Sequence, residues 1–270
     1  MSIVNSVEFV VGFIATGAAR AVSAPLNPNY SSSEVEFYLN DTKPVLLLLP
    51  PLSSPGTTPS ERKGAEQALE AAKKIGVRAA EFSVDYRGAV HVQVIHEPLD
   101  AKFRGVEANR QDPHPDDVAL VLHTSGTTGR PKSVPLTHHN LLTTTGNIVQ
   151  TYWLTPSDRS YLVMPLFHVH GLLAGLLAPL RSGGSVVIID KFSAGRFWKD
   201  FASTKATWYT AVPTIHSILL SAPVPNPLPR IRFIRSCSSS LSPTVFKRLE
   251  ETFKAPVLEA YAMTEAAHQM

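Results

Sequence analysis

The sequence contains little cysteine and no long uninterrupted apolar run. Cys237 is the only cysteine in 270 residues, so no internal disulfide can form. This excludes a small disulfide scaffold and favours a reducing compartment. The apolar start, Met1 to Ala24, is interrupted by Glu8 and Arg20, which leaves a run shorter than the roughly 20 residues of a membrane-spanning helix. No basic residue precedes that run, as a signal peptide would require, so the sequence predicts a buried amphipathic helix there.

Charged residues are also scarce, at 17% of the chain, against about 25% in a typical globular domain. The 25 Lys and Arg nearly balance the 22 Asp and Glu, and no basic block occurs. Arg62-Lys63 and Lys73-Lys74 come closest to one, and they are typical of a solvated helix face. We therefore expect no nucleic-acid partner. Apolar residues make up 44% of the chain, which predicts a sizeable core and excludes a disordered or collagen-like chain.

Short apolar runs alternate with segments of helical periodicity along most of the chain. Such runs fit strands that are buried on both faces, as in parallel sheets. The predicted strands are 45–49, 77–84, 118–123, 161–164, 186–189, 207–210, 231–235 and 257–261. The predicted helices include 4–19, 31–39, 61–75, 137–150, 171–180, 213–220 and 243–253. This alternation predicts an α/β fold of stacked, mostly parallel sheets flanked by helices.

A polar segment, 96–117, carries Pro98, Pro113 and Pro115 and separates two halves of the sequence. We therefore expect one α/β subdomain at 1–117 and a second at 118–270.

The most informative segment follows the predicted strand 118–123 and reads His-Thr-Ser-Gly-Thr-Thr-Gly-Arg-Pro-Lys over 123–132. Its glycines allow the backbone to approach a phosphate closely, and its hydroxyls and Lys132 supply donors. This composition predicts a cradle for a triphosphate. Lys132-Ser133 matches the end of a Walker A loop, but Pro131 stands where that loop needs glycine, and proline has no amide to donate. The composition alone leaves open a plain Ser/Thr/Gly loop without a ligand.

The order Ser-Gly-Thr-Thr-Gly-x-Pro-Lys at 125–132 resembles the signature of the adenylate-forming superfamily, which includes acyl-CoA synthetases, coumarate–CoA ligases, luciferases and adenylation domains. A second segment, Tyr-Ala-Met-Thr-Glu at 261–265, is similar to the Tyr-Gly-x-Thr-Glu element of that family, with Ala262 in place of glycine. A third, Met-Pro-Leu-Phe-His-Val-His-Gly at 164–171, looks like its substrate-gate segment. The resemblance implies that this chain is the core of the large amino-terminal domain of an adenylate-forming enzyme.

Members of this family join a carboxylate to AMP, release pyrophosphate and then pass the acyl group to a thiol. The resemblance therefore implies ATP, Mg²⁺ and CoA as cofactors or co-substrates. It implies catalytic roles for Thr264 on the α-phosphate, for Glu265 as the Mg²⁺ ligand, and for Lys132 beside the β- and γ-phosphates. The serine-rich loop after strand 231–235 resembles the adenine-binding loop of the family, although by itself it reads as a flexible turn. The implied nucleotide-binding residues are Thr124, Ser125, Gly126, Thr127, Thr128, Gly129, Lys132, Ser238, Ser239, Ser240, Tyr261, Thr264 and Glu265.

The strings at 233–238 and 258–266 resemble the oxalate–CoA ligase branch of the family, which includes plant oxalyl-CoA synthetases and their yeast peroxisomal relatives. A small dicarboxylate needs hydrogen-bond donors, and the chain offers His168, His170, Ser238 and His268 as substrate residues. A charged or a neutral imidazole could serve as such a donor. Two alternatives stay open: a 4-coumarate- or medium-chain fatty-acyl-CoA ligase with the same nucleotide site, and a truncated, non-catalytic fragment that only binds nucleotide.

Family members continue for well over a hundred residues beyond the position of Met270. By resemblance, the mobile carboxy-terminal domain with its catalytic lysine is absent, and the first subdomain is incomplete at its start. We therefore expect the sequence to be part of a larger enzyme of the cytoplasm or the peroxisome, with any carboxy-terminal targeting signal outside this chain. The expected partners are a small carboxylic acid, ATP and CoA, without a membrane span.

Overall fold

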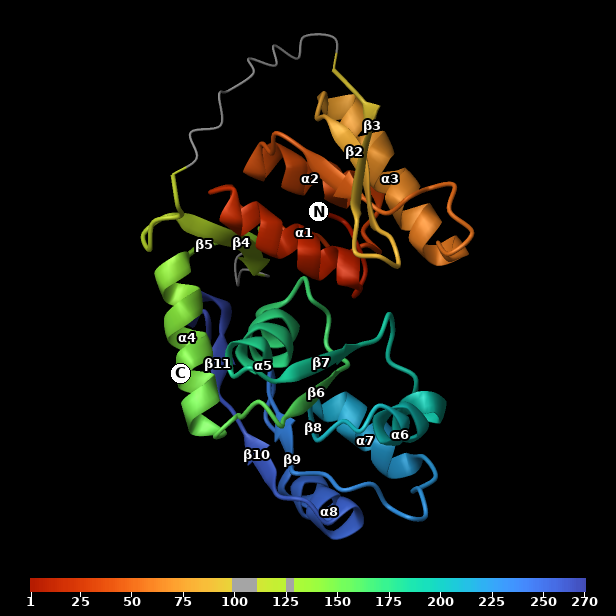
Figure 1. The fold of residues 1–270 in the computed structure, drawn as a ribbon, viewed down its shortest axis with the longest axis vertical. Helices are drawn as coiled ribbons and strands as arrows, with labels where there is room; N and C mark the ends of the chain where they lie inside the picture. The colour runs from red at the N-terminus through yellow and green to blue at the C-terminus, as the bar shows by residue number, and fades with distance from the viewer. Residues whose placement is uncertain (99–110, 125–128) are drawn as a thin grey trace. The chain divides into compact units, whose positions relative to one another are not determined.

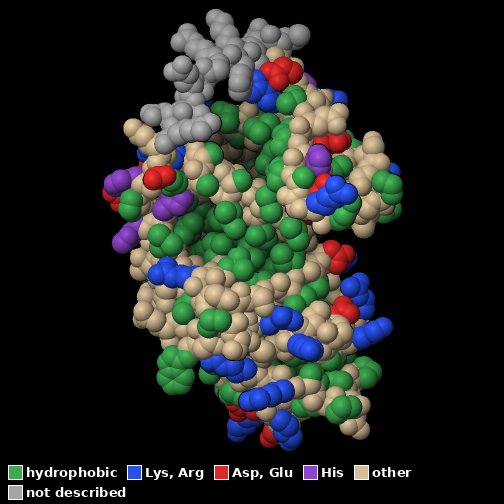
Figure 2. Space-filling view, viewed as in Figure 1, with side chains coloured by type: hydrophobic (Ala, Val, Ile, Leu, Met, Phe, Trp, Pro, Cys, Tyr) green, Lys and Arg blue, Asp and Glu red, His purple; other side chains and the backbone are tan. Residues whose placement is uncertain are grey.

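The computed structural model describes residues 1–98, 111–124 and 129–270 (Figure 1). Within them the chain forms two compact units, Met1–Leu122 and His123–Met270. No helix in these ranges is long and apolar enough to cross a membrane. On the face drawn in Figure 2, Lys and Arg side chains lie scattered among other surface residues rather than in one block.

In its described residues, 1–98 and 111–122, the first unit has a three-stranded sheet and three helices. The sheet has the order β1-β2-β3, in which β1 runs parallel to β2 and β3 runs antiparallel to it. Leucines of β1 and alanines of α3 form much of the core. The elements are α1 (Val7–Ala18), α2 (Ser32–Thr42), β1 (Leu47–Leu49), α3 (Pro59–Ile75), β2 (Ala79–Val84) and β3 (Val90–His96).

Local sequence signals explain where two of these helices begin and end. Ser31 and Glu34 form a capping box at the start of α2, and Thr58 and Glu61 form another at the start of α3. Each box satisfies backbone amides that have no partner within the helix. Gly76 ends α3 in the left-handed conformation, at φ 77°, which glycine adopts without steric cost.

The second unit is built on a five-stranded parallel sheet with the order β10-β9-β8-β6-β7. Aromatic side chains of β6, α6 and β8 pack edge to face in its core, for example Tyr161, Phe197 and Tyr209. The strands are β6 (Arg159–Leu162), β7 (Ser185–Ile188), β8 (Trp208–Ala211), β9 (Phe233–Ser236) and β10 (Val257–Glu259). The α-helices are α4 (His138–Thr151), α5 (Ala178–Arg181), α6 (Ala194–Ser203), α7 (Pro213–Ser221) and α8 (Pro243–Phe253).

Short elements complete the part of the chain that carries the predicted motifs. Strand β4 crosses the boundary between the units, and the last residues form an antiparallel hairpin of β11 and β12 around a single 3-10 turn. These elements are β4 (Val118–Thr124), β5 (Lys132–Thr137), β11 (Ala262–Met263), η2 (Thr264–Ala266) and β12 (His268–Gln269).

The predicted α/β fold with mostly parallel strands is confirmed, with several local differences. Strand β3 was not predicted, although its valines alternate with polar residues and leave 49–56% of their surface exposed. Strand β5 was not predicted either. The helix predicted at 171–180 is instead the π-helix η1 (His170–Leu177), followed by α5. Single π-helical turns often occur at functional sites.

Gly171 allows the start of η1 to pass close to the preceding chain. A Cβ atom at this position would meet the carbonyl oxygens of Pro165 and of Met164, the latter at 2.7 Å. Neither backbone atom can yield cheaply. We therefore expect Gly171→Ala to lower the free energy of unfolding by about 1–3 kcal/mol, the usual cost of overpacking.

Gly195 in α6 provides the matched control, because a Cβ there would have no atom within 4 Å. Gly195→Ala should leave stability unchanged or raise it by up to about 1 kcal/mol, as expected for alanine in a helix. Urea unfolding measures both changes as shifts of the midpoint at constant slope. Equal midpoints for the two variants would contradict the steric argument.

Candidate active site

The predicted substrate residues lie near the carboxyl ends of the central parallel strands. Thr210 of β8 and Arg235 of β9 face each other as register partners in neighbouring strands. His170 begins η1, a few residues after β6 ends, and Ser238 follows β9 by two residues. Because the carboxyl ends of parallel strands meet at one edge of the sheet, ligands of open α/β sheets bind there.

His170 is the centre of a small polar cluster. Its ring is buried, with 2% of its surface exposed. Nδ1 lies 2.9 Å from Oγ of Ser238, and Nε2 lies 2.6 Å from Oγ1 of Thr210. The ring also stacks on His268, with 5.5 Å between centroids. Three of the four predicted substrate residues therefore come together from segments far apart in the sequence.

His168, the fourth predicted substrate residue, lies outside this hydrogen-bonded cluster. Its side chain is exposed, and its ring packs beside Phe167 with 5.0 Å between centroids. The structure therefore separates the two histidines of the gate segment into a buried one and an exposed one.

Arg235 completes the cluster and was missed by the sequence reasoning. Its side chain is fully buried, at 0% exposure. It donates from Nε to the Tyr152 hydroxyl at 3.0 Å, from Nη1 to Thr210 at 3.2 Å, and from Nη2 to Nε2 of His268 at 3.1 Å. An arginine inside an apolar strand is the signal that could have found it, because such a strand is buried on both faces.

Two residues of the cluster hold unusual backbone conformations. Ser238 has φ 76°, and His268 has φ 105°. Residues other than glycine rarely occupy this region, and those that do cluster at functional sites. The antiparallel pairing of Met263 with His268 and the buried ring contacts hold the second of these conformations in place.

Both buried histidines of the cluster are neutral at pH 7. Burial lowers the pKa of His170 well below its usual value, and the positive charge of Arg235 lowers this pKa further. The same two causes, in the same order, lower the pKa of His268. Both rings are therefore uncharged in this structure.

His216, which is buried on α7 beside Tyr209, makes the fold sensitive to acid. Burial lowers its pKa from 6.5 to about 4. Between these values the unfolded chain binds more protons than the folded chain, so stability falls as the pH falls. We expect the free energy of unfolding to drop by about 1 kcal/mol per pH unit for this residue alone below pH 6.5.

Urea unfolding at pH 7, 6 and 5 measures this decline. The variant His216→Gln removes the titrating group, so its stability should fall less steeply with pH than that of the wild type. Identical pH dependences for the two proteins would show that His216 does not cause the acid sensitivity.

The predicted phosphate loop lies between β4 and β5. Ser125, Gly126, Thr127 and Thr128 lie outside the described residues. Thr124 is the last residue of β4, and Lys132 is the exposed first residue of β5. Gly129 has φ 90°, a conformation that favours glycine.

The predicted adenine loop follows β9. Ser238, Ser239 and Ser240 are exposed, and the amide of Leu241 donates to a carboxylate oxygen of Glu259 at 2.8 Å. This bond fixes the end of the loop to β10. The Tyr261 side chain is 75% exposed, so its ring is open to a ligand.

Thr264 and Glu265 begin the turn η2 between β11 and β12. Thr264 is half-buried, whereas Glu265 is exposed and lines a cavity of about 250 Å³ together with residues of α4. Within the described residues no cluster of three or more His, Cys, Asp or Glu could hold a metal ion. Mg²⁺ is usually held by one or two carboxylates together with phosphates and waters, so a single Glu265 fits a metal that arrives with its nucleotide.

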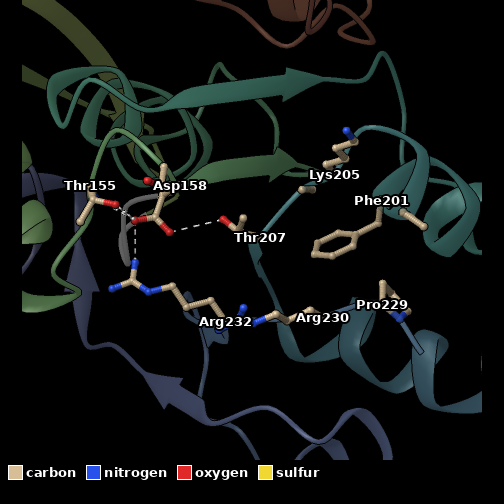
Figure 3. Close-up of a pocket in the computed structure, with 11 residues that line it drawn as sticks. Thr155, Asp158, Phe201, Lys205, Thr207, Pro229, Arg230 and Arg232 are labelled. Carbon is tan, nitrogen blue, oxygen red and sulfur yellow. Dashed lines mark hydrogen bonds and ion pairs between the residues drawn. The ribbon is translucent and has the colours of Figure 1, made fainter. Parts of the chain in front are cut away.

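A larger cavity, of about 620 Å³, opens at the opposite, amino ends of β6, β8 and β9 (Figure 3). Asp158 lies at its wall and accepts from Nη1 of Arg232 at 2.7 Å and from the amide of Thr155 at 2.8 Å. The contact with Arg232 joins the start of β9 to the start of β6, across β8, which lies between them in the sheet. None of the predicted site residues that the structure describes lines this cavity, so the candidate site is placed at the carboxyl ends of the strands instead.

Comparisons with known proteins agree with the motifs. Residues 2–270 match the family described as AMP-binding enzyme. The chain is 45% identical to oxalate–CoA ligase of Saccharomyces cerevisiae, over 100% of this chain and 51% of that protein. It is 48% identical to oxalate–CoA ligase of Arabidopsis thaliana, over 98% of this chain and 50% of that protein.

Among solved structures, ATP-bound MatB from Rhodopseudomonas palustris is similar, with a TM-score of 0.76 and 27% identity over 99% of this chain and 50% of that chain. The chain thus spans about half the length of the curated relatives that it matches. The match across nearly the whole chain shows that it belongs to the AMP-binding enzyme family.

Proposed function

We propose that the protein carrying this chain activates oxalate with ATP and transfers the product to CoA. One carboxylate of oxalate attacks the α-phosphate of ATP, giving oxalyl-adenylate and pyrophosphate. The thiol of CoA then displaces AMP and forms oxalyl-CoA. The proposal is supported by the names of the two oxalate–CoA ligases at 45% and 48% identity. The structural observation that supports the proposal is the polar cluster around His170.

Oxalate sets a specific demand on its binding site. One of its two adjacent carboxylates must be free to react, and the other must be held. Burying that second charge without partners would be very costly. His170, Ser238 and His268 supply polar groups within one cluster. A fatty or cinnamic acid would leave such groups unpaired, so the cluster favours a small dicarboxylate.

We propose that Thr124 to Gly129 bind the β- and γ-phosphates together with Lys132. Ser238 to Ser240 would lie against the adenine, and Tyr261 would stack on it. Thr264 would donate to the α-phosphate, and Glu265 would supply one oxygen ligand to Mg²⁺. Charge grows on the phosphate oxygens during adenylation, and fixed donors and the metal would neutralise it.

The division into subdomains 1–117 and 118–270 stays part of this proposal. We further propose that the enzyme acts in the cytoplasm or the peroxisome, on oxalate or another small carboxylic acid, ATP and CoA.

A substrate panel tests the proposed function. Pyrophosphate release by the complete protein is measured with oxalate, malonate, coumarate and octanoate. We expect oxalate to give the highest kcat/KM, and His268→Ala to lower that value about tenfold to hundredfold, the scale of a hydrogen bond to a charged group. The exposed His114 provides the control, since His114→Ala should change nothing.

A highest kcat/KM with coumarate or octanoate, unchanged in His268→Ala, would contradict the oxalate proposal and favour the larger-acid alternative. Binding of ATP in a calorimetric titration, without pyrophosphate release on any of the four acids, would favour a non-catalytic nucleotide-binding protein.

A further inference from the structure

Arg235 is a buried cation that has no acidic partner among residues 1–98, 111–124 and 129–270. Its side chain has 0% exposure, and its hydrogen-bond partners are the neutral groups of Tyr152, Thr210, His268 and Gln269. No carboxylate in the described part of the chain forms an ion pair with it. A buried charge without a counter-charge is costly, so its retention calls for an explanation beyond packing.

The contact between Arg235 and His268 fixes which nitrogen of the histidine carries the proton. A guanidinium can only donate, so Nε2 of His268, at 3.1 Å from Nη2, must accept. In a neutral imidazole the other nitrogen, Nδ1, is then protonated. This Nδ1 is buried and has no hydrogen-bond partner among the described residues. His268 therefore holds an unused donor.

A second chain of hydrogen bonds starts at the same guanidinium. Oγ1 of Thr210 accepts from Nη1 of Arg235 at 3.2 Å. The hydroxyl of Thr210 can in turn donate its proton to Nε2 of His170, which lies 2.6 Å away. When the hydroxyl of Thr210 donates to this nitrogen, Nδ1 of His170 carries the proton and donates to Oγ of Ser238 at 2.9 Å. The hydroxyl proton of Ser238, which is exposed, stays available for another acceptor.

We propose that Arg235 is a positioning residue that sets the direction of both chains, so that His268 Nδ1–H and the Ser238 hydroxyl donate to the non-reacting carboxylate of oxalate. The proposal rests on the proposed function. Four donor contacts of Arg235 go to protein groups, so the guanidinium acts through His268 and Thr210 rather than by touching the substrate.

This arrangement explains how the site selects a dicarboxylate while its histidines are neutral. Both hydrogen-bond chains start at the positive charge of Arg235, which polarises their hydrogen bonds in the same direction. Both chains end on a donor. A monocarboxylic acid with an apolar tail would leave both donors unpaired, which lowers its binding relative to oxalate.

The wild-type protein provides the first test, in the absence of substrate. Nitrogen-15 NMR of the complete protein with labelled histidine distinguishes a protonated from a bare ring nitrogen. The spectrum of His268→Asn assigns the His268 signals by their loss. We expect a neutral ring with Nδ1 protonated at pH 7. A ring with Nε2 protonated, or a doubly protonated ring, overturns the proposal.

Two substitutions of His268 test the roles of its two ring nitrogens separately. The amide of Asn reaches about as far as Nδ1, whereas the amide of Gln reaches about as far as Nε2. His268→Asn can keep the donor to the substrate, and His268→Gln can keep only the acceptor for Arg235. We expect the KM for oxalate to rise more in His268→Gln than in His268→Asn, with the KM for ATP unchanged in both. The reverse order contradicts the proposal.

Substitution of Arg235 tests the positioning role directly. We expect Arg235→Met to raise the KM for oxalate about tenfold to hundredfold, with less change in the KM for ATP, and to lose the fixed protonation of His268. Arg235→Lys should recover part of both properties. The control is Arg232→Met, which removes the ion pair with Asp158 at the other end of the sheet and should leave both KM values unchanged.

An unchanged KM for oxalate in a folded Arg235→Met variant overturns the proposal. If that variant does not fold, the proposal is tested by the NMR spectrum of the wild type and by the KM values of His268→Asn and His268→Gln. Failure of the proposed function can be told apart from failure of this inference, because the substrate panel would then show the highest kcat/KM with another acid. The NMR result does not depend on which acid is the substrate.

Discussion

Replacing Lys132 by alanine is expected to weaken ATP binding about tenfold to hundredfold. Lys132 is exposed at the start of β5 and ends the segment rich in hydroxyls and glycines. In our proposal its ammonium group donates to the β- or γ-phosphate. A hydrogen bond between two charged groups contributes about 1.5–3 kcal/mol, which corresponds to that loss of affinity.

Calorimetric titration of the complete protein with ATP measures this effect. Lys247, exposed on α8, supplies a control for the loss of one positive charge, and Lys247→Ala should bind ATP as the wild type does. Because Lys132 is exposed, the melting temperature of Lys132→Ala without nucleotide should stay close to that of the wild type. An unchanged affinity for ATP would show that the loop does not bind the triphosphate.

Replacing Glu265 by glutamine is expected to slow adenylation about a hundredfold to a thousandfold, the scale of removing one group that stabilises the transition state. The substitution keeps the shape of the side chain and removes its charge. In our proposal this charge holds Mg²⁺ beside the phosphates. Glu265 is exposed, so the stability of the fold should change by less than about 0.5 kcal/mol.

Pyrophosphate release at saturating ATP and oxalate measures the rate, and a thermal melt measures stability. Raising the Mg²⁺ concentration should recover part of the rate in Glu265→Gln, because the weakened metal site is then filled more often. Glu251→Gln, at an exposed position on α8, should match the wild type in both measurements. Parallel losses of rate and stability in Glu265→Gln would mean that Glu265 has a structural role.

The elements that the sequence predicted correctly depend on local interactions. Helix α3 begins at a capping box formed by Thr58 and Glu61 and ends at Gly76, and each of these signals acts within a few residues of the chain. The apolar runs that became β6, β8 and β9 could be recognised because both faces of a central parallel strand are buried. That these three segments are strands therefore follows from their composition over four or five residues.

Strand β3 depended on an interaction outside its own segment. Its alternating valines are largely exposed, so no buried apolar run marked it. It is a strand because it pairs antiparallel with β2, for example Val92 with Phe82. The π-helix η1 differs from the predicted helix for a similar reason, since the close approach of Gly171 to Pro165 and Met164 is a tertiary contact.

Motifs in the sequence were enough to name the chemical groups of the candidate site: the hydroxyls, glycines and lysine around β4 and β5, the serines after β9, and the histidines at 170 and 268. Tertiary packing is what stacks His170 on His268, leaves His168 exposed, and brings Arg235 from β9 to His268. It also decided that both buried rings are neutral. Desolvation and hydrogen-bond direction depend on neighbours that are brought together across 33 to 68 residues of chain, and no local sequence pattern records such neighbours.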